Sequence, residues 1–138
     1  KSLSNAGISV IVMVAPVLPG LTDHEIPNII QSAADAGAMG AGYIMLRLPY
    51  GVSDIFSKWL QRHFPDRMDK VLNRIRSIRD GELNSKDFHG RMKGKGIYAE
   101  QVKDMFELAK RKAGMKNNMI ELSTDHFRRP GGTQLNLL

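Results

Sequence analysis

One stretch decides the fold: Ile8-Ser9-Val10-Ile11-Val12-Met13-Val14-Ala15. It is rich in β-branched residues and almost continuously apolar, which is typical of a parallel strand covered on both faces. We expect Pro16 and Pro19-Gly20 to end this strand, because proline cannot donate a ladder hydrogen bond. The preceding residues Leu3-Ser4-Asn5-Ala6-Gly7 have the pattern of a last helical turn closed by glycine. The stretch therefore predicts a buried strand in an α/β protein.

A helix and a second strand are expected next. Thr22-Asp23-His24-Glu25 matches a capping box, in which the threonine hydroxyl accepts a hydrogen bond from the amide three residues later. Residues 41–49 form a second apolar run that ends in proline. Strand, helix and strand make a βαβ unit with parallel strands and a right-handed crossover. The apolar positions of the helix, at spacings of three and four, are Ile26, Ile29, Ile30, Ala33, Ala34 and Gly37.

More helices are expected after this unit. Ser53 is a candidate N-cap, and Phe64-Pro65 is expected to interrupt the helix that begins there. A second helix then runs to Asp80-Gly81. The remaining predicted segments are a polar loop over residues 82–96, an amphipathic helix over 98–113 and a short strand over 119–122.

Length and composition indicate one globular domain. The 138 residues, 42% of them hydrophobic and 25% charged, exclude a collagen-like, disulfide-scaffold or wholly disordered chain. We divide it into βαβα units over residues 1–81 and the loop, helix and tail of the same domain over residues 82–138. No run of about 18 apolar residues and no secretory signal occurs, so we expect a cytoplasmic protein without a membrane partner. The start lacks Met, and we expect the chain to be cut from a longer protein.

The sequence offers little support for a metal site. It contains no cysteine, which excludes disulfides, thiolate nucleophiles and any iron–sulfur cluster that this chain ligates itself. The four histidines, at positions 24, 63, 89 and 126, include no pair at helical spacing. His24 lies in the capping turn, and we interpret it as a solvated residue rather than an acid or base. We predict no metal ligand in this chain.

Basic residues gather in the middle of the chain. Residues 51–95 carry 11 basic and six acidic side chains, a net charge of +5. Such an excess attracts phosphate groups, although a solvated helix face produces the same charge. Lys93-Gly94-Lys95-Gly96 lacks the Walker pattern and follows no predicted strand, so we interpret it as a surface loop. The candidate nucleic-acid-binding residues are Lys70, Arg74, Arg76, Arg91, Lys93 and Lys95.

The most informative single residue is Arg47. In parallel α/β sheets ligands bind outside the carboxyl ends of the strands, where residues 15–20 and 46–49 are expected. A guanidinium in an otherwise apolar run needs an anionic or polar partner to offset its desolvation. That partner is either a ligand or a structural salt bridge at the rim of the sheet, and both stay open. A βαβ crossover would place Pro16 and Arg47 at the same end of adjacent strands.

Several segments together resemble one protein family. Their order and spacing are similar to those of radical S-adenosylmethionine proteins of the DNA repair photolyase-like family, which are relatives of spore photoproduct lyase. The resemblance covers most of the chain, and the last segment is its most specific motif. The segments are Ala6-Gly7-Ile8, Ala15-Pro16-Val17-Leu18-Pro19-Gly20-Leu21-Thr22-Asp23, Ala36-Gly37-Ala38, Leu46-Arg47-Leu48-Pro49, Trp59-Leu60 and Arg91-Met92-Lys93-Gly94-Lys95-Gly96-Ile97-Tyr98-Ala99.

The resemblance implies a fold, a reaction and cofactors. The fold is a partial TIM-type (β/α)6 barrel of parallel strands, of which this chain would form the C-terminal β/α units, followed by additional helices. The reaction is a lyase-like reaction of DNA repair that begins when a 4Fe-4S cluster cleaves S-adenosylmethionine to a radical. In the family a tri-cysteine motif near the N-terminus holds the cluster, so its ligands would lie in the missing N-terminal part of the barrel. The residues implied to line the cofactor cleft are Pro16, Leu46, Arg47 and Leu48.

Three functions stay open. The leading one is a C-terminal fragment of such an enzyme, inactive alone, whose partner is the missing N-terminal part of the barrel. The second is a basic module that binds DNA through phosphates without reading bases. The third is a structural fragment in which Arg47 binds no ligand. An opened barrel would also expose strand edges and apolar side chains, among which we expect Val10, Val12, Ile44 or Leu46, so the isolated chain would self-associate.

Overall fold

The computed structural model describes residues 1–85, 90–115 and 123–125. Its elements in chain order are α1 (Ser2–Asn5), β1 (Ile11–Val17), η1 (Asp23–Glu25), α2 (Ile26–Asp35), β2 (Gly40–Met45), α3 (Val52–His63), η2 (Pro65–Arg67), α4 (Met68–Ser77) and α5 (Ile97–Lys112). β1 and β2 pair in parallel, which confirms the predicted βαβ unit. In the described part of the chain the sheet has these two strands and no more, so the structure does not show a partial barrel.

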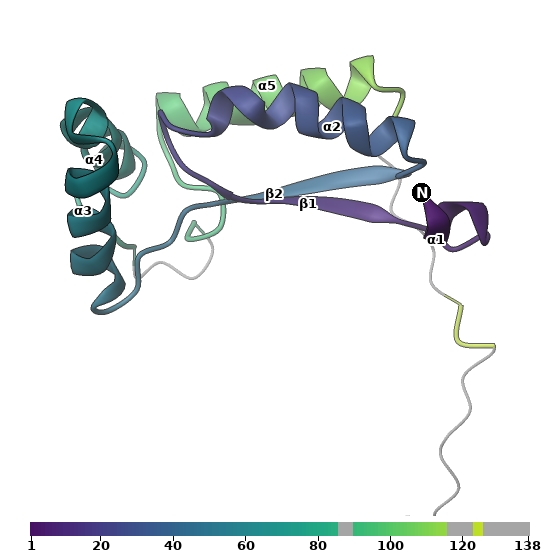
Figure 1. Ribbon diagram of the computed structural model, residues 1–138, viewed down its shortest axis with the longest axis horizontal. Coiled ribbons are helices and arrows are strands. Elements are labelled where there is room, and N and C mark those ends of the chain that lie inside the picture. Colours follow the sequence, from purple (N-terminus) through teal and green to yellow (C-terminus); the bar gives the residue numbers. More distant parts are fainter. Residues whose placement is uncertain (86–89, 116–122, 126–138) are drawn as a thin grey trace, which may run out of the picture.

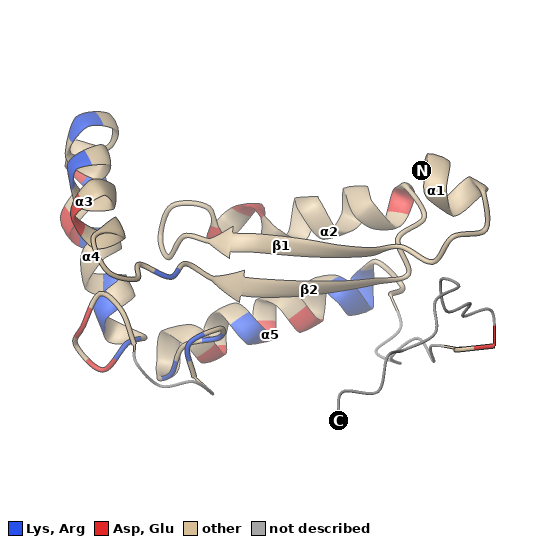
Figure 2. Cartoon of the chain, turned by 90° about the horizontal axis from the view of Figure 1, so that it is seen from below, with Lys and Arg blue, Asp and Glu red and all other residues tan. Residues whose placement is uncertain are grey.

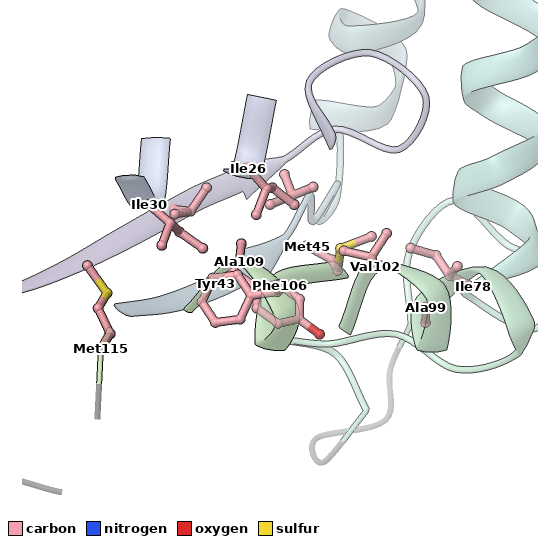
Figure 3. Packing of buried hydrophobic residues seen from close by; sticks show 12 residues of the cluster. Ile26, Ile30, Tyr43, Met45, Ile78, Ala99, Val102, Phe106, Ala109 and Met115 are labelled. Atoms are coloured by element: carbon pink, nitrogen blue, oxygen red, sulfur yellow. The ribbon is translucent and has the colours of Figure 1, made fainter. Parts of the chain in front are cut away.

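Helices cover one face of this sheet. α2 and α5 lie next to each other against it, and the opposite face carries no helix within the described residues (Figure 1). Ile26 and Ile30 stand four residues apart on α2 and are completely buried against the sheet. Phe106 of α5 packs on Tyr43 of β2 with their ring centroids 4.6 Å apart (Figure 3). Each such side chain contributes about 1.5–3 kcal/mol by burial, so the core between helices and sheet holds the layers together.

A second core forms beyond the carboxyl ends of the strands. Both strand arrows point toward the pair of helices α3 and α4 (Figure 2). Phe64-Pro65 separates these helices, as predicted from the sequence. The buried residues of this second core come from the two helices and from the segments that follow β1 and β2: Leu21, Leu48, Leu60, Val71, Leu72 and Ile75.

The first strand differs from its prediction in limits and in environment. It begins at Ile11 and continues to Val17, so it runs through Pro16 rather than ending there. The Ala15–Pro16 peptide bond is cis, and the register with β2 shifts between Val14 and Val17. A shift of this kind lets the strand accommodate a residue that cannot donate to the ladder.

The prediction that the strand is covered on both faces is wrong for the described residues. Ile11 and Met13 are each 56% exposed, whereas Val14 and Val17 are buried. A Cβ on Gly42 would lie 3.0 Å from the Met13 Cε, so the side chains of β1 and the glycines of β2 share this face. We call it the open face, and define it by Ile11, Met13, Ala15, Gly40, Gly42 and Ile44.

The residues of the open face differ in part from those expected to form an exposed apolar surface. Ile44 belongs to it, as expected, since Tyr43 and Met45 point to the core between sheet and helices. Val12 pairs with Ala41, which packs against that core, so Val12 lies on the helical side of the sheet. Leu46 packs against the second core. The sequence pattern identified the apolar strands but placed two of these side chains on the wrong surface.

Two predicted helix caps are also wrong. The Thr22 hydroxyl accepts a hydrogen bond from the Leu18 amide at 3.0 Å and makes no cap contact with Glu25. It therefore closes the turn after β1, and α2 begins only at Ile26. Ser53 lies inside α3, where its hydroxyl donates to the carbonyl of Tyr50. In both cases a short polar side chain bonds to an earlier residue of the chain, which competes with capping.

The remaining expectations concern the later segments. α5 ends at Lys112, before Gly114, as the amphipathic pattern predicts. Residues 119–122, for which a strand was expected, lie outside the described residues. Every helix within the described ranges is too short or too polar to cross a membrane.

Candidate functional site

The carboxyl end of the two-stranded sheet brings Pro16 and Arg47 to one place in the fold. Val17 pairs with Met45 at the end of the ladder, and the Leu46 amide donates to the Val17 carbonyl at 2.9 Å. Pro16 lies just before this pair and Arg47 just after it. The predicted position of both residues at the same end of adjacent parallel strands is therefore confirmed.

Arg47 is half-buried and has no partner in the described part of the chain. Its Nε is inaccessible to solvent and makes no hydrogen bond. No ion pair joins its guanidinium to a described Asp or Glu. Of the two partners that the sequence left open, the structural salt bridge is thus missing among the described residues, and the guanidinium carries an uncompensated desolvation cost.

Arg79 lies beneath this end of the sheet and is 2% exposed. Its Nη2 donates to the Leu46 carbonyl at 3.0 Å, and its Nη1 donates to the Gly90 carbonyl at 3.3 Å. Burial lowers the pKa of the Arg79 guanidinium, and the positive charge of Arg47 lowers it further. Arg79 therefore ties the end of β2 to the loop at Gly90 and places a second cation close to Arg47.

Sequence analysis did not identify Arg79 as a site residue, although a signal was present. Arg79 continues the apolar period of α4, in which Val71 and Ile75 occupy the two preceding turns. A charged residue at a core position of a helix is expected to bond to buried polar groups. Here these groups are two main-chain carbonyls.

A second polar cluster fixes the loop after β1. The Tyr98 hydroxyl of α5 donates to the Asp23 carboxylate, and it accepts from the Gly20 amide at 3.0 Å. The Arg74 guanidinium lies 3.9 Å from that carboxylate and 4.8 Å from the centre of the Tyr98 ring. Burial raises the pKa of Tyr98 to about 12, and the hydrogen bond to Asp23 adds to the shift. We call these four residues, Gly20, Asp23, Arg74 and Tyr98, the tyrosine cluster.

The tyrosine cluster joins three elements that the sequence did not connect. Gly20 follows β1, Arg74 lies on α4 and Tyr98 lies on α5. A Cβ on Gly20 would lie 2.7 Å from Arg74 Nη1, and the φ of +77° at this position also favours glycine. Because its residues come from distant parts of the chain, no spacing of residues in the sequence predicts this cluster.

The six candidate nucleic-acid-binding residues do not share one environment. Arg74 belongs to the tyrosine cluster, and the Lys93 Nζ donates to the Tyr43 carbonyl at 2.9 Å beside β2. Lys95 pairs with Asp80 at 3.8 Å, where both side chains are exposed. The other three are Lys70, which is exposed on α4, Arg76, whose Nη1 donates to Asn73 Oδ1 at 3.1 Å, and Arg91, which is half-buried. DNA binding by this set stays a prediction.

The segment around Lys93 closes the outer edge of β2. The Met45 amide donates to the Met92 carbonyl at 2.9 Å, and the Lys93 ammonium lies 3.5 Å from the centre of the Tyr43 ring. Desolvation of this ammonium lowers the pKa of Lys93. A cleft of about 510 Å³ opens between this segment and α5, lined in part by Glu100, Lys103 and Glu107. The lysine-glycine run thus contributes structural contacts and a mixed-charge cleft.

The four implied cofactor residues differ in access. Pro16 is exposed and Arg47 is half-buried at the carboxyl end of the sheet, so both can meet a ligand. Leu48 is 1% exposed in the second core, and Leu46 packs against the same core. The structure therefore leaves only main-chain atoms of Leu48 for a ligand, and the contact of all four with a cofactor stays a prediction.

The described residues hold no group of three His, Cys, Asp or Glu side chains that could bind a metal ion. His24 is exposed in η1, and His63 contacts the Trp59 ring at the end of α3. The histidines at positions 89 and 126 lie outside the described ranges. Arg47, Arg79 and the tyrosine cluster are consequently the polar groups that mark this end of the sheet.

Comparisons with known proteins identify no relative. No family model, no curated protein and no solved structure matches this chain.

Proposed function

We propose that this chain is the C-terminal part of a radical S-adenosylmethionine enzyme of the DNA repair photolyase-like family, and that its carboxyl sheet edge contributes to the cofactor and substrate cleft. The observation that carries the proposal is the one-sided sheet. α2 and α5 both pack on one face, and within the described residues the opposite face is apolar and exposed. In a β/α barrel the strands have helices outside and face their neighbours inside, so the same asymmetry is expected of a barrel sector.

The open face fits the interior of a barrel in detail. Ile11 and Met13 alternate with the less exposed Val12 and Val14, as inward-facing side chains of barrel strands alternate with outward-facing ones. Gly40 and Gly42 lie opposite them, and the side chains of Ile11 and Met13 lie over these glycines. Two strands alone are marginal as an independent sheet, so further strands on this sheet would stabilise it.

The polar groups lie where such an enzyme needs them. Ligands of β/α barrels bind at the carboxyl ends of the strands, and Arg47 and Pro16 occupy that end. Arg79 and the tyrosine cluster hold the adjacent segments through Leu46 and Gly20. This chain would therefore position and bind the anionic or polar part of a ligand.

The residues of this chain do not fit the iron–sulfur cluster. The sequence has no cysteine, and the described residues offer no other metal-binding group. Cluster ligands would have to come from the preceding part of the enzyme, and we assign no step of the reaction to the cluster in this chain.

The experiment uses the product of the complete gene, purified without oxygen. With S-adenosylmethionine and dithionite we expect methionine and 5′-deoxyadenosine to form, and we expect Arg47→Ala to slow this reaction at least tenfold. Arg111→Ala is the matched control, because Arg111 is exposed in the last turn of α5, which lies at the opposite end of the sheet (Figure 1). A product that binds no iron, or one that holds a cluster but leaves S-adenosylmethionine intact, would exclude the proposal.

A further inference from the structure

We propose that Arg47 binds an oxyanion, either a phosphate or a carboxylate group of a ligand, and that Arg79 is the positioning residue that holds the segment carrying it. This deepens the proposed function, on which it rests for the presence of a ligand at the carboxyl end of the sheet. The chemistry of that ligand follows from the positive charges of Arg47 and Arg79, which have no negative partner among the described residues.

The Arg47 guanidinium has no hydrogen-bond or ion-pair partner within the described residues. Its Nε is buried without a hydrogen bond, and no acceptor in the described part of the chain meets its Nη atoms. A half-buried guanidinium has lost part of its hydration and gains nothing in return here. Because its planar fork matches the two oxygens of a carboxylate or phosphate, an oxyanion would supply the missing bonds.

Arg79 is a second buried cation without a carboxylate partner among the described residues. Arg79 is 2% exposed and bonds only to neutral carbonyls, those of Leu46 and Gly90. No described carboxylate forms an ion pair with it. Two positive charges close together at low solvent exposure repel each other, and an anion at Arg47 would relieve that repulsion.

The two arginines have different roles. Each Nη of Arg79 donates to a main-chain carbonyl and the residue is 2% exposed, so its guanidinium is held inside the fold and is not presented to a ligand. It holds the main chain at Leu46, one residue before Arg47, and its charge adds to the attraction for an anion. Arg47 has its Nη atoms open and is the residue that contacts the ligand.

The test follows the Nε–Hε resonances of arginine in the ¹⁵N-labelled 138-residue chain. Inorganic phosphate is titrated in one arm and acetate in another, with ionic strength held constant by sodium chloride. We expect the Arg47 resonance to move along a saturating curve in at least one arm. The arm that saturates at lower concentration identifies the group as phosphate or carboxylate.

Two variants make the result specific. Arg47→Gln should weaken binding of the saturating anion at least tenfold, whereas Arg111→Gln, at an exposed position in the last turn of α5, should leave it unchanged. Arg79→Lys retains the charge but loses the fork that bonds two carbonyls, and it should weaken binding while the backbone amide spectrum still shows a folded chain. If Arg79→Lys does not fold, the comparison of Arg47→Gln with Arg111→Gln still decides.

Two outcomes would overturn the proposal: linear shifts shared by all arginines, or equal affinity in Arg47→Gln and the wild type. Neither depends on iron or on S-adenosylmethionine. Failure of the proposed function would leave a measured anion site in place, and failure of the anion site would leave the cleavage of S-adenosylmethionine to be judged separately.

Discussion

At the scale of the residue, Tyr98 shows how one polar group organises a loop. Its hydroxyl has partners on both sides: it donates to Asp23 and accepts from the Gly20 amide. The loop that follows β1 is therefore held from α5 rather than by contacts within itself. A hydroxyl that bonds to a carboxylate in a partly buried place favours its neutral form, which explains the raised pKa of Tyr98.

The first prediction concerns the titration of this hydroxyl. The absorbance of tyrosinate at high pH, measured in the wild type and in Tyr98→Phe, should differ by one component with a midpoint at a pH of about 12. Because folding raises this pKa from an ordinary value of about 10, the stability that Tyr98 contributes is complete below pH 10 and is lost as the pH rises through 12.

The same variant should lower the free energy of unfolding at neutral pH. Removal of the hydroxyl leaves the Gly20 amide and the Asp23 carboxylate without this partner, a loss of about 1–3 kcal/mol. Urea unfolding at pH 7 and at pH 12 measures the difference between the two proteins. A difference that stays constant over this range would show that the hydroxyl is not bonded in the folded chain.

Only some residues of the candidate site could be predicted from the sequence. Arg47 stood out because a charge interrupted an apolar run, and that signal is local. Arg79 and Tyr98 act through carbonyls, amides and carboxylates more than ten residues away, and no spacing in the sequence encodes those contacts. Arg74 and Lys93 look like surface cations in a basic segment, yet their side chains turn toward the fold.

At the scale of the element, the segment that closes β2 depends on a glycine. Gly94 has a φ of +78°, and a Cβ there would lie 3.0 Å from the Ile78 Cβ and 3.2 Å from the Ile78 carbonyl oxygen. The Lys95 amide donates to that same carbonyl. The segment can therefore follow the edge of β2 only where the side chain is absent.

The second prediction compares two glycines of similar conformation. Gly114 has a φ of +69°, and no atom lies within 4 Å of the place that an added methyl group would take, so Gly114→Ala should cost only the backbone strain, about 1–2 kcal/mol. Gly94→Ala should cost about 1–3 kcal/mol more, since it also forces the methyl group against the main chain of Ile78. Urea denaturation of both variants measures the two losses. Equal losses would mean that this segment does not pack against Ile78.

The elements themselves were largely predictable, and their ends were not. The apolar periods of α2 and α5 recur in the structure, because Ile26, Ile30 and Phe106 need a sheet to cover them. The predicted end of β1 was wrong at Pro16, where a register shift lets the strand continue to Val17. The predicted cap was wrong at Thr22, because its hydroxyl accepts a hydrogen bond from the earlier Leu18 amide. Local preferences yield to such contacts, since each is worth only about 1 kcal/mol.

At the scale of the whole molecule, the open face is an apolar surface that no described element covers. Ile11 and Met13 are exposed over more than half of their surfaces, and β1 pairs only with β2 among the described residues. An exposed apolar surface beside a strand edge favours association with another chain. The same surface would be internal in a complete barrel.

The third prediction is that the isolated chain self-associates through this face. Light scattering after size-exclusion chromatography should give a mass that falls over a tenfold dilution. Met13→Lys should shift the chain toward the monomer, because it places a charge on the open face. Ile55→Lys, at a 70% exposed position on α3, is the control and should change little. A monomer at all concentrations would show that the open face does not drive association.

If this chain is part of a larger barrel, the open face lies inside that barrel in the full-length protein. The chain has no cysteine of its own, so Met13→Cys adds an assignable thiol to the product of the complete gene. Its alkylation rate in the native protein, followed by mass spectrometry of the peptide, is compared with that of Leu108→Cys, which lies on α5 at a position that is 43% exposed. We expect the thiol at position 13 to react at least tenfold more slowly, and we expect the two rates to become equal in urea. Equal rates in the native protein would contradict it.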